Sequence, residues 1–293
     1  MKKFLAVLAV AALSANAFGG EREGYKATDD MKDAGKNIEK SYKQVANPMR
    51  PVAGLVTLPL GRTVYYTGEA IEILGKAGVE SAIKNVESTG ACLKDSHGLG
   101  NNSACVVEFP GKLTVTVVNV TGYSVANVMD AVGGVATAPF QIAAEASADL
   151  SAWLEKNNVP LAPQVARAFS IVFDKGGQIV GVTVTTLSGG VREAADGIAM
   201  TVTEVFNIPA SALRGDLKGA GRSALIGLGR GMCTVIDGTL ILGVRLVAGI
   251  VGVFSGKAAP VQGCNQGFDE DAKAIRNGTF VPRAPADDMY HGG

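Results

Sequence analysis

The chain has 293 residues, with 27 basic and 27 acidic side chains, 47% hydrophobic residues and 38 glycines. The balanced charge excludes a protein that binds nucleic acid through a basic surface, and the apolar content excludes a disordered chain. Only two histidines occur, His97 and His291, which disfavours zinc chemistry and histidine-based hydrolysis. The sequence therefore predicts no catalytic, cofactor or metal site.

The first 17 residues have the features of a cleavable secretory signal peptide. Lys2 and Lys3 form a short positive segment, residues 4–13 are apolar, and the Ala-Asn-Ala sequence at 15–17 supplies small residues before a cleavage site. The apolar run is shorter than the roughly 20 residues that span a bilayer as a helix. We therefore predict an exported protein, with a bacterial periplasmic, outer-envelope-associated or extracellular location favoured.

Four cysteines remain after the signal peptide, and export permits disulfide bonds. Cys92 and Cys105 bracket a polar segment rich in glycine and asparagine, which predicts a bond between them. Cys233 and Cys264 form the second pair by elimination. The alternative for Cys233 is a buried free thiol, which is common in an apolar stretch such as the one that contains it.

Helical periodicity marks the amino-terminal part of the mature chain. Segment 18–50 is highly charged, yet apolar residues recur every three or four positions, as expected of an amphipathic helix that Thr28 caps and Pro48 ends. Segment 51–104 contains a second helical pattern, over residues 64–86, followed by the segment between the first two cysteines.

The central segment, 105–220, predicts an α+β fold. Residues 106–109 and 113–120 are rich in β-branched side chains and are separated by Pro110-Gly111, which is typical of a β-hairpin. The runs 169–173 and 179–187 predict a second hairpin. Helical patterns follow each hairpin, over 125–132 and 141–156 after the first, and over 191–206 after the second.

The two hairpin-helix blocks resemble one another. A shift of 66 positions aligns Val125 with Val191 and Asp130 with Asp196. This similarity predicts a tandem ββα duplication. The alternative is a chance likeness between two blocks rich in alanine and valine.

A glycine-rich apolar segment, 221–256, follows and predicts helices that pack closely on a core, a partner or a membrane surface. A complete membrane span over the apolar run 238–254 is disfavoured, because Arg245 lies near the middle of this run. Basic residues recur along this segment and the residues before it, and we expect them to contact a partner or membrane surface: Arg214, Lys218, Arg222, Arg230 and Arg245. A polar tail, 257–293, ends the chain.

These features favour a non-enzymatic structural or binding protein of the cell envelope. We expect its amphipathic, glycine-rich helices to pack on a protein partner, on a second copy or on a membrane surface, and we expect no nucleic-acid partner. Two alternatives stay open. One is a secreted hydrolase whose carboxylates include Asp130 and Asp196, and the other is a soluble periplasmic carrier with an apolar cavity.

Overall fold

In the computed structural model, placement is described for residues 23–45, 49–95, 98–257, 261, 263 and 264. Within this part of the chain the regular elements are helices, and it contains no strand. The predicted α+β class is therefore wrong, and the protein is a helical bundle. The predicted signal peptide, residues 1–17, lies outside the described residues.

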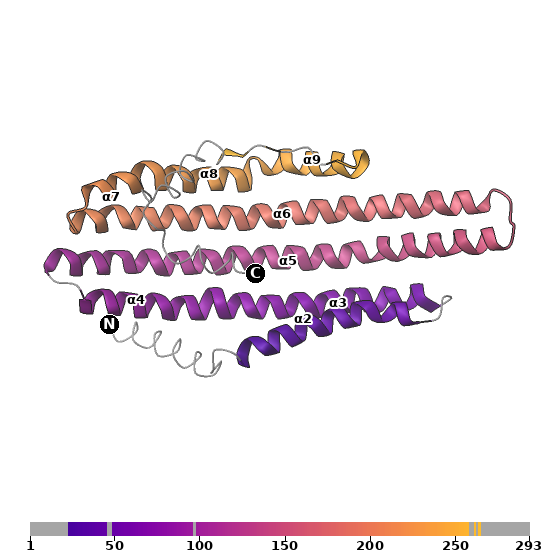
Figure 1. The fold of residues 1–293 in the computed structure, drawn as a ribbon, viewed down its shortest axis with the longest axis horizontal. Helices are drawn as coiled ribbons and strands as arrows, with labels where there is room; N and C mark the ends of the chain where they lie inside the picture. Colours follow the sequence, from indigo (N-terminus) through magenta and orange to yellow (C-terminus); the bar gives the residue numbers. More distant parts are fainter. Residues whose placement is uncertain (1–22, 46–48, 96–97, 258–260, 262, 265–293) are drawn as a thin grey trace, which may run out of the picture.

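Two long antiparallel helices, α5 (Leu99–Lys156) and α6 (Ala162–Leu213), form the centre of the molecule (Figure 1). They have 58 and 52 residues, which gives lengths of about 87 and 78 Å at 1.5 Å per residue. The turn between them contains Asn158, whose φ of 53° ends the first helix in the left-handed conformation that asparagine tolerates.

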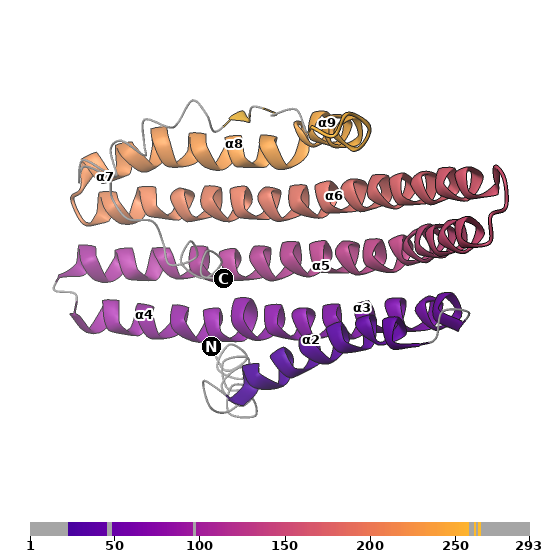
Figure 2. The ribbon, with the colours of Figure 1, turned by 45° about the vertical axis from the view of Figure 1, so that its right-hand side comes forward.

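Three helical segments run one after another along α5: α3 (Arg50–Ile73), the π-helix η3 (Leu74–Glu80) and α4 (Ser81–Asp95). The amino-terminal helix α2 (Glu23–Ser41) and the short 3-10 helix η1 (Tyr42–Gln44) pack on α3. Both views show α4, α5, α6 and α8 side by side in that order (Figures 1 and 2).

The glycine-rich segment forms the opposite edge of this row. It contains α7 (Leu217–Arg222), the π-helix η4 (Ser223–Gly227), α8 (Leu228–Thr239) and α9 (Leu242–Ser255). Helices α8 and α9 both pack on α6 (Figure 1).

Small residues bring the helix backbones together. A Cβ atom added to Gly61 of α3 would lie 2.6 Å from the backbone nitrogen of Glu39 in α2. One added to Gly238 of α8 would lie 2.6 Å from the carbonyl oxygen of Gly190 in α6. These contacts exclude any side chain at either glycine, so glycine is required at both helix crossings.

The contacts between α5 and α6 recur every 11 residues. Three α5 glycines and their α6 partners show this spacing: Gly111 with Phe206, Gly122 with Ala195, and Gly133 with Val184. Eleven residues complete three helical turns to within about 20°, so positions 11 apart stay on one side of a helix. The spacing therefore keeps α5 and α6 in contact over most of their length.

Both predicted hairpins are wrong, since their residues belong to α5 and α6. The glycines that suggested turns are packing positions. A Cβ atom on Gly111 would lie 2.8 Å from the Phe206 ring, and one on Gly177 would lie 3.1 Å from the Cβ of Phe140. The β-branched runs form helix because contacts between α5 and α6 outweigh their local preference for strands. Within the helix the Thr116 hydroxyl donates to the Lys112 carbonyl oxygen four residues back, at 3.1 Å.

The predicted ββα duplication fails with its strands, because both blocks are uninterrupted helix. Asp130 and Asp196, which the 66-residue shift aligns, each face the other long helix, since Asp130 contacts Arg192 of α6 and Asp196 contacts Tyr123 of α5.

Candidate functional site

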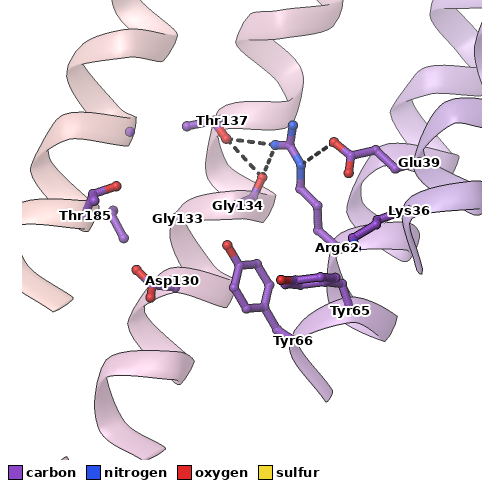
Figure 3. A pocket seen from close by; sticks show the side chains of 12 residues that line it. Lys36, Glu39, Arg62, Tyr65, Tyr66, Asp130, Gly133, Gly134, Thr137 and Thr185 are labelled. Atoms are coloured by element: carbon purple, nitrogen blue, oxygen red, sulfur yellow. Dashed lines mark hydrogen bonds and ion pairs between the residues drawn. The ribbon is translucent and has the colours of Figure 1, made fainter. Parts of the chain in front are cut away.

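A polar cleft of about 440 Å³ lies where α2, α3, α5 and α6 meet (Figure 3). Its walls combine two tyrosines with charged and hydroxyl side chains and with glycine backbone: Lys36 and Glu39 from α2; Arg62, Tyr65 and Tyr66 from α3; Asp130, Gly133, Gly134 and Thr137 from α5; Gly181, Val184 and Thr185 from α6. The cleft is therefore polar, unlike the apolar cavity expected of a carrier of apolar ligands.

Arg62 fixes the geometry of this cleft. Its Nε donates to Glu39 at 3.1 Å, its Nη1 donates to Thr137 Oγ1 at 2.8 Å and to the Gly134 carbonyl oxygen, and its Nη2 donates to Gln141 Oε1 at 2.8 Å. One guanidinium thus connects α2, α3 and α5 (Figure 3). Because its donors are engaged within the protein, its role is structural.

Two tyrosines of α3 form the aromatic wall. The Tyr65 and Tyr66 rings lie 5.3 Å apart between centroids at an interplanar angle of 89°, and the Lys36 ammonium lies 5.6 Å from the Tyr65 ring centroid. Burial raises the pKa of the Tyr66 hydroxyl, and the negative charge of Asp130 raises it further. Burial also raises the pKa of the nearby Glu69 carboxyl. The positive charge of Arg192 acts in the opposite direction and lowers this pKa, but burial has the larger effect.

The structure places Asp130 and Asp196 in separate hydrogen-bonding environments. Asp130 accepts hydrogen bonds from Ser188 and, at 2.6 Å, from Arg192. Asp196 accepts from the Tyr123 hydroxyl at 3.1 Å. Each carboxylate is thus engaged by its own partners, and the arrangement expected of a paired acid and base is absent from this part of the described chain.

A second feature is an exposed surface that carries no charge. Within 50–74, 99–147, 176–212 and 228–255, every Asp, Glu, Lys and Arg is buried or half-buried. The exposed residues of α5 from 106 to 139 repeat every three or four positions and are Val106, Pro110, Thr114, Val117, Thr121, Val125, Val128, Val132, Val135, Ala136 and Pro139. We call this row, together with the exposed residues of 52–71 in α3 and 198–209 in α6, the uncharged face.

The opposite side of α5 carries mainly small and polar residues. Asn119 and Asn127 are 4% and 2% exposed, whereas Val117 and Val128 are 64% and 62% exposed. The Asn127 amide donates to the Tyr66 carbonyl oxygen at 3.0 Å. Small and polar groups thus predominate between the helices while valines lie outside them, unlike the usual pattern of a helix at a water-exposed surface.

Charges within these spans are paired between helices. Asp130 of α5 pairs with Arg192 of α6, and Glu193 of α6 pairs with Arg245 of α9. Arg245 also has a raised pKa, because Glu193 accepts its hydrogen bond. Within these spans the helices therefore keep their charges away from the exposed surface, whereas the ends of α5 and α6 that meet at the turn carry exposed charges such as Glu155 and Arg167.

The five basic residues expected at a partner or membrane surface do not form one free stripe. Arg214 pairs with Glu108 at the end of α5, and Arg245 pairs with Glu193. Arg230 is half-buried, whereas Lys218 and Arg222 lie in the short helix α7. Ion pairs between distant helices thus account for two of the five residues.

Both predicted disulfide bonds are confirmed. Cys92 and Cys105 join α4 to α5 with 5.9 Å between their Cα atoms, and Cys233 and Cys264 tie the segment after α9 to α8 with a Cα separation of 5.2 Å. The buried Asp237 carboxylate accepts a hydrogen bond from the Cys264 amide at 2.5 Å. Two disulfides are compatible with an exported protein.

The described residues offer neither a single membrane-spanning helix nor a cluster of metal ligands. No single helix there is both long and apolar enough to cross a bilayer, although the pair Leu217–Thr239 and Leu242–Ser255, bent by 45°, passes by length and composition when taken together. The described residues contain no group of three or more potential metal ligands. His97 and His291 lie outside the described residues.

Comparisons with family models, curated proteins and solved structures found no match.

Proposed function

We propose that the chain is an exported, non-enzymatic structural protein of the cell envelope that assembles with further copies of itself through the uncharged face. The observation that carries this proposal is the neutral exposed row on α5, in which valine is the commonest residue. A helix surface in contact with water is normally charged, and large exposed apolar patches mark interaction sites.

The size of the uncharged face is sufficient for stable association. The row from Val106 to Pro139 extends for about 50 Å, and adding one neighbouring helix at a spacing of about 10 Å gives an area near 1,000 Å². A stable protein interface buries about 800 Å² on each partner. Val106, Val117 and Val128 also lie 11 residues apart, so the row stays straight enough for a second long helix to pack along it.

The chemistry of the row favours a protein partner over a lipid surface. Helices that bind at a membrane surface usually expose tryptophan, phenylalanine or leucine, together with lysine or arginine beside them. The exposed residues of 106–139 include none of these types, and the exposed leucines of the α3 part of the face, Leu55 and Leu60, have no exposed lysine or arginine beside them. Valine and threonine lose little side-chain freedom when they pack, so a second copy can bury them at low entropic cost.

The test is sedimentation of the mature protein, with both disulfides intact, over a wide range of concentration. We expect reversible oligomers. The double variant Val117→Asp/Val128→Asp should raise the dissociation constant at least about a hundredfold, because each carboxylate would be buried unpaired in the interface.

The matched control is Val165→Asp/Val172→Asp, whose side chains are 55% and 64% exposed in α6 but lie outside the uncharged face. This variant should assemble as the wild type does. A monomeric wild-type protein, or equal effects of the two variants, would contradict the proposal. A third outcome is that the protein floats with anionic vesicles. If this binding requires Val117 and Val128 but does not require self-association, the uncharged face would be assigned to a membrane instead.

A further inference from the structure

We propose that the polar cleft between α2, α3, α5 and α6 binds a small, neutral, polyhydroxylated molecule of the mono- or disaccharide class. The cleft volume of about 440 Å³ lies in the range of small-molecule sites, about 300–1,000 Å³. The site is distinct from the uncharged face, so this inference does not depend on self-association.

The aromatic wall suits the apolar side of a sugar ring. Tyr65 and Tyr66 stand nearly perpendicular to each other and both line the cleft (Figure 3). Aromatic faces stack against apolar C–H groups while their hydroxyls form hydrogen bonds at the edge. Among the described residues, no hydrogen bond engages either tyrosine hydroxyl, so both are available to a ligand.

The opposite walls supply further hydrogen-bonding groups at fixed positions. Ser188 and Arg192 hold the Asp130 carboxylate, and each of its oxygens keeps a lone pair that can accept from a ligand hydroxyl. Thr185 lines the cleft from α6 and is exposed, so its hydroxyl can donate or accept. A ligand rich in hydroxyl groups matches this mixture of donors and acceptors.

The charge balance of the walls selects a neutral ligand. The charged lining residues are two cations, Lys36 and Arg62, and two anions, Glu39 and Asp130. Arg62 is paired with Glu39, and Asp130 is paired with Arg192 outside the lining. Lys36 is paired with Asp33 at 3.3 Å. An ionic ligand would have to displace one of these pairs or leave a charge unbalanced, whereas a neutral polyol leaves the pairs intact.

Isothermal titration calorimetry of the mature, disulfide-bonded protein tests this assignment. The probes are glucose, galactose, maltose and lactose as neutral sugars, with glucuronate and glucosamine as cyclic analogues of similar size and opposite charge. We expect saturable binding of at least one neutral sugar and at least about tenfold weaker binding of both charged analogues. Tyr66→Ala should weaken binding about tenfold through loss of the stacking face.

Asn37→Ala is the control, because Asn37 is exposed on α2 beside Lys36 but neither lines the cleft nor belongs to the uncharged face. It should bind as the wild type does. If Tyr66→Ala does not fold, as judged by circular dichroism, Thr185→Trp replaces it, since an indole at this exposed position would fill the cleft and should abolish binding. Absence of binding by all four neutral sugars, preference for a charged analogue, or full binding by a folded cleft variant would overturn the proposal.

Discussion

The two sides of α5 differ in a way that describes the whole molecule. Toward the other helices the chain places asparagine, glycine, alanine and paired charges, and toward the outside it places valine, threonine and proline. The isolated chain therefore buries small or polar groups and exposes much of its large apolar surface. Close backbone contact and hydrogen bonds therefore hold the helices together, whereas apolar area remains available for association.

The buried hydrophobic residues support this description. Most of those in the described chain are alanines, and a compact cluster of larger side chains occurs where Tyr42, Leu58 and Ile142 meet around Ala138. Burial of alanine contributes little apolar area. Stability must then depend strongly on how closely the helix backbones approach one another.

The largest expected effect comes from blocking such an approach. In Gly197→Ala the new Cβ would lie 2.5 Å from the backbone nitrogen of Val235 and 2.8 Å from the carbonyl oxygen of Gly231 in α8. Backbone atoms cannot rotate aside, so α6 and α8 must separate. We expect the free energy of unfolding to fall by about 3 kcal/mol in urea denaturation followed by circular dichroism.

The control is Gly189→Ala in the same helix, where no atom lies within 4 Å of an added Cβ. Alanine favours a helix over glycine, so this change should raise the free energy of unfolding by up to about 1 kcal/mol. Equal effects at positions 189 and 197 would show that backbone contact does not limit stability.

The helical periodicity of 18–50, 64–86, 141–156 and 191–206 predicted helix correctly where the structure describes these segments, and local boundary signals added further detail. The end of α5 before Asn157-Asn158 and the pairing of the four cysteines follow from residues that lie close to those features. The runs 113–120 and 179–187 misled because valine and threonine favour strands locally, whereas contacts between α5 and α6 decide the conformation. The sequence signal that was missed is the 11-residue spacing of Gly111, Gly122 and Gly133, which indicates long helices.

A second substitution removes polar contacts between the helices. Arg62→Met keeps much of the side-chain volume but removes the donors to Glu39, Gly134, Thr137 and Gln141. The Arg62 side chain is 16% exposed, so its partners would be left partly desolvated. We expect a loss of about 2–3 kcal/mol in unfolding free energy, measured by urea denaturation.

Arg167→Met is the matched control, because the Arg167 side chain is 65% exposed in its pair with Glu155. Exposed pairs contribute little, so its stability should stay within about 0.5 kcal/mol of wild type. A comparable loss in both variants would mean that Arg62 contributes no more than a surface ion pair.

The cleft itself could not be predicted from the sequence. Arg62 lies 72 to 79 positions from Gly134, Thr137 and Gln141, and no local pattern links these residues. Asp130 was identified as a candidate, but through its alignment with Asp196, whereas the structure pairs it with Arg192. The uncharged face is different, since the absence of charge from 113–129 is visible in the sequence, although assigning it to one helix requires the fold.

The smallest expected effect is a pH dependence of stability at Tyr42, which links η1 to the polar side of α5. The Tyr42 hydroxyl donates to the Glu145 carboxylate at 2.8 Å, and burial together with this carboxylate raises the pKa of Tyr42 to about 12. An unfolded tyrosine has a pKa of about 10, so the folded state holds this proton more tightly. Stability from this group is therefore complete below pH 10 and is lost as the pH rises from about 10 to 12.

Tyr42→Phe should remove this part of the alkaline loss, at a cost of about 1 kcal/mol at neutral pH for the missing hydrogen bond. The measurement is urea denaturation at closely spaced pH values through the alkaline range. Tyr65→Phe, which changes an equivalent hydroxyl in the cleft wall, should keep the wild-type loss. Because lysines and the other tyrosines also titrate there, the difference between the two variants carries the result. If Tyr42→Phe loses stability with pH as steeply as Tyr65→Phe does, the hydrogen bond to Glu145 does not couple this tyrosine's proton to the folded state.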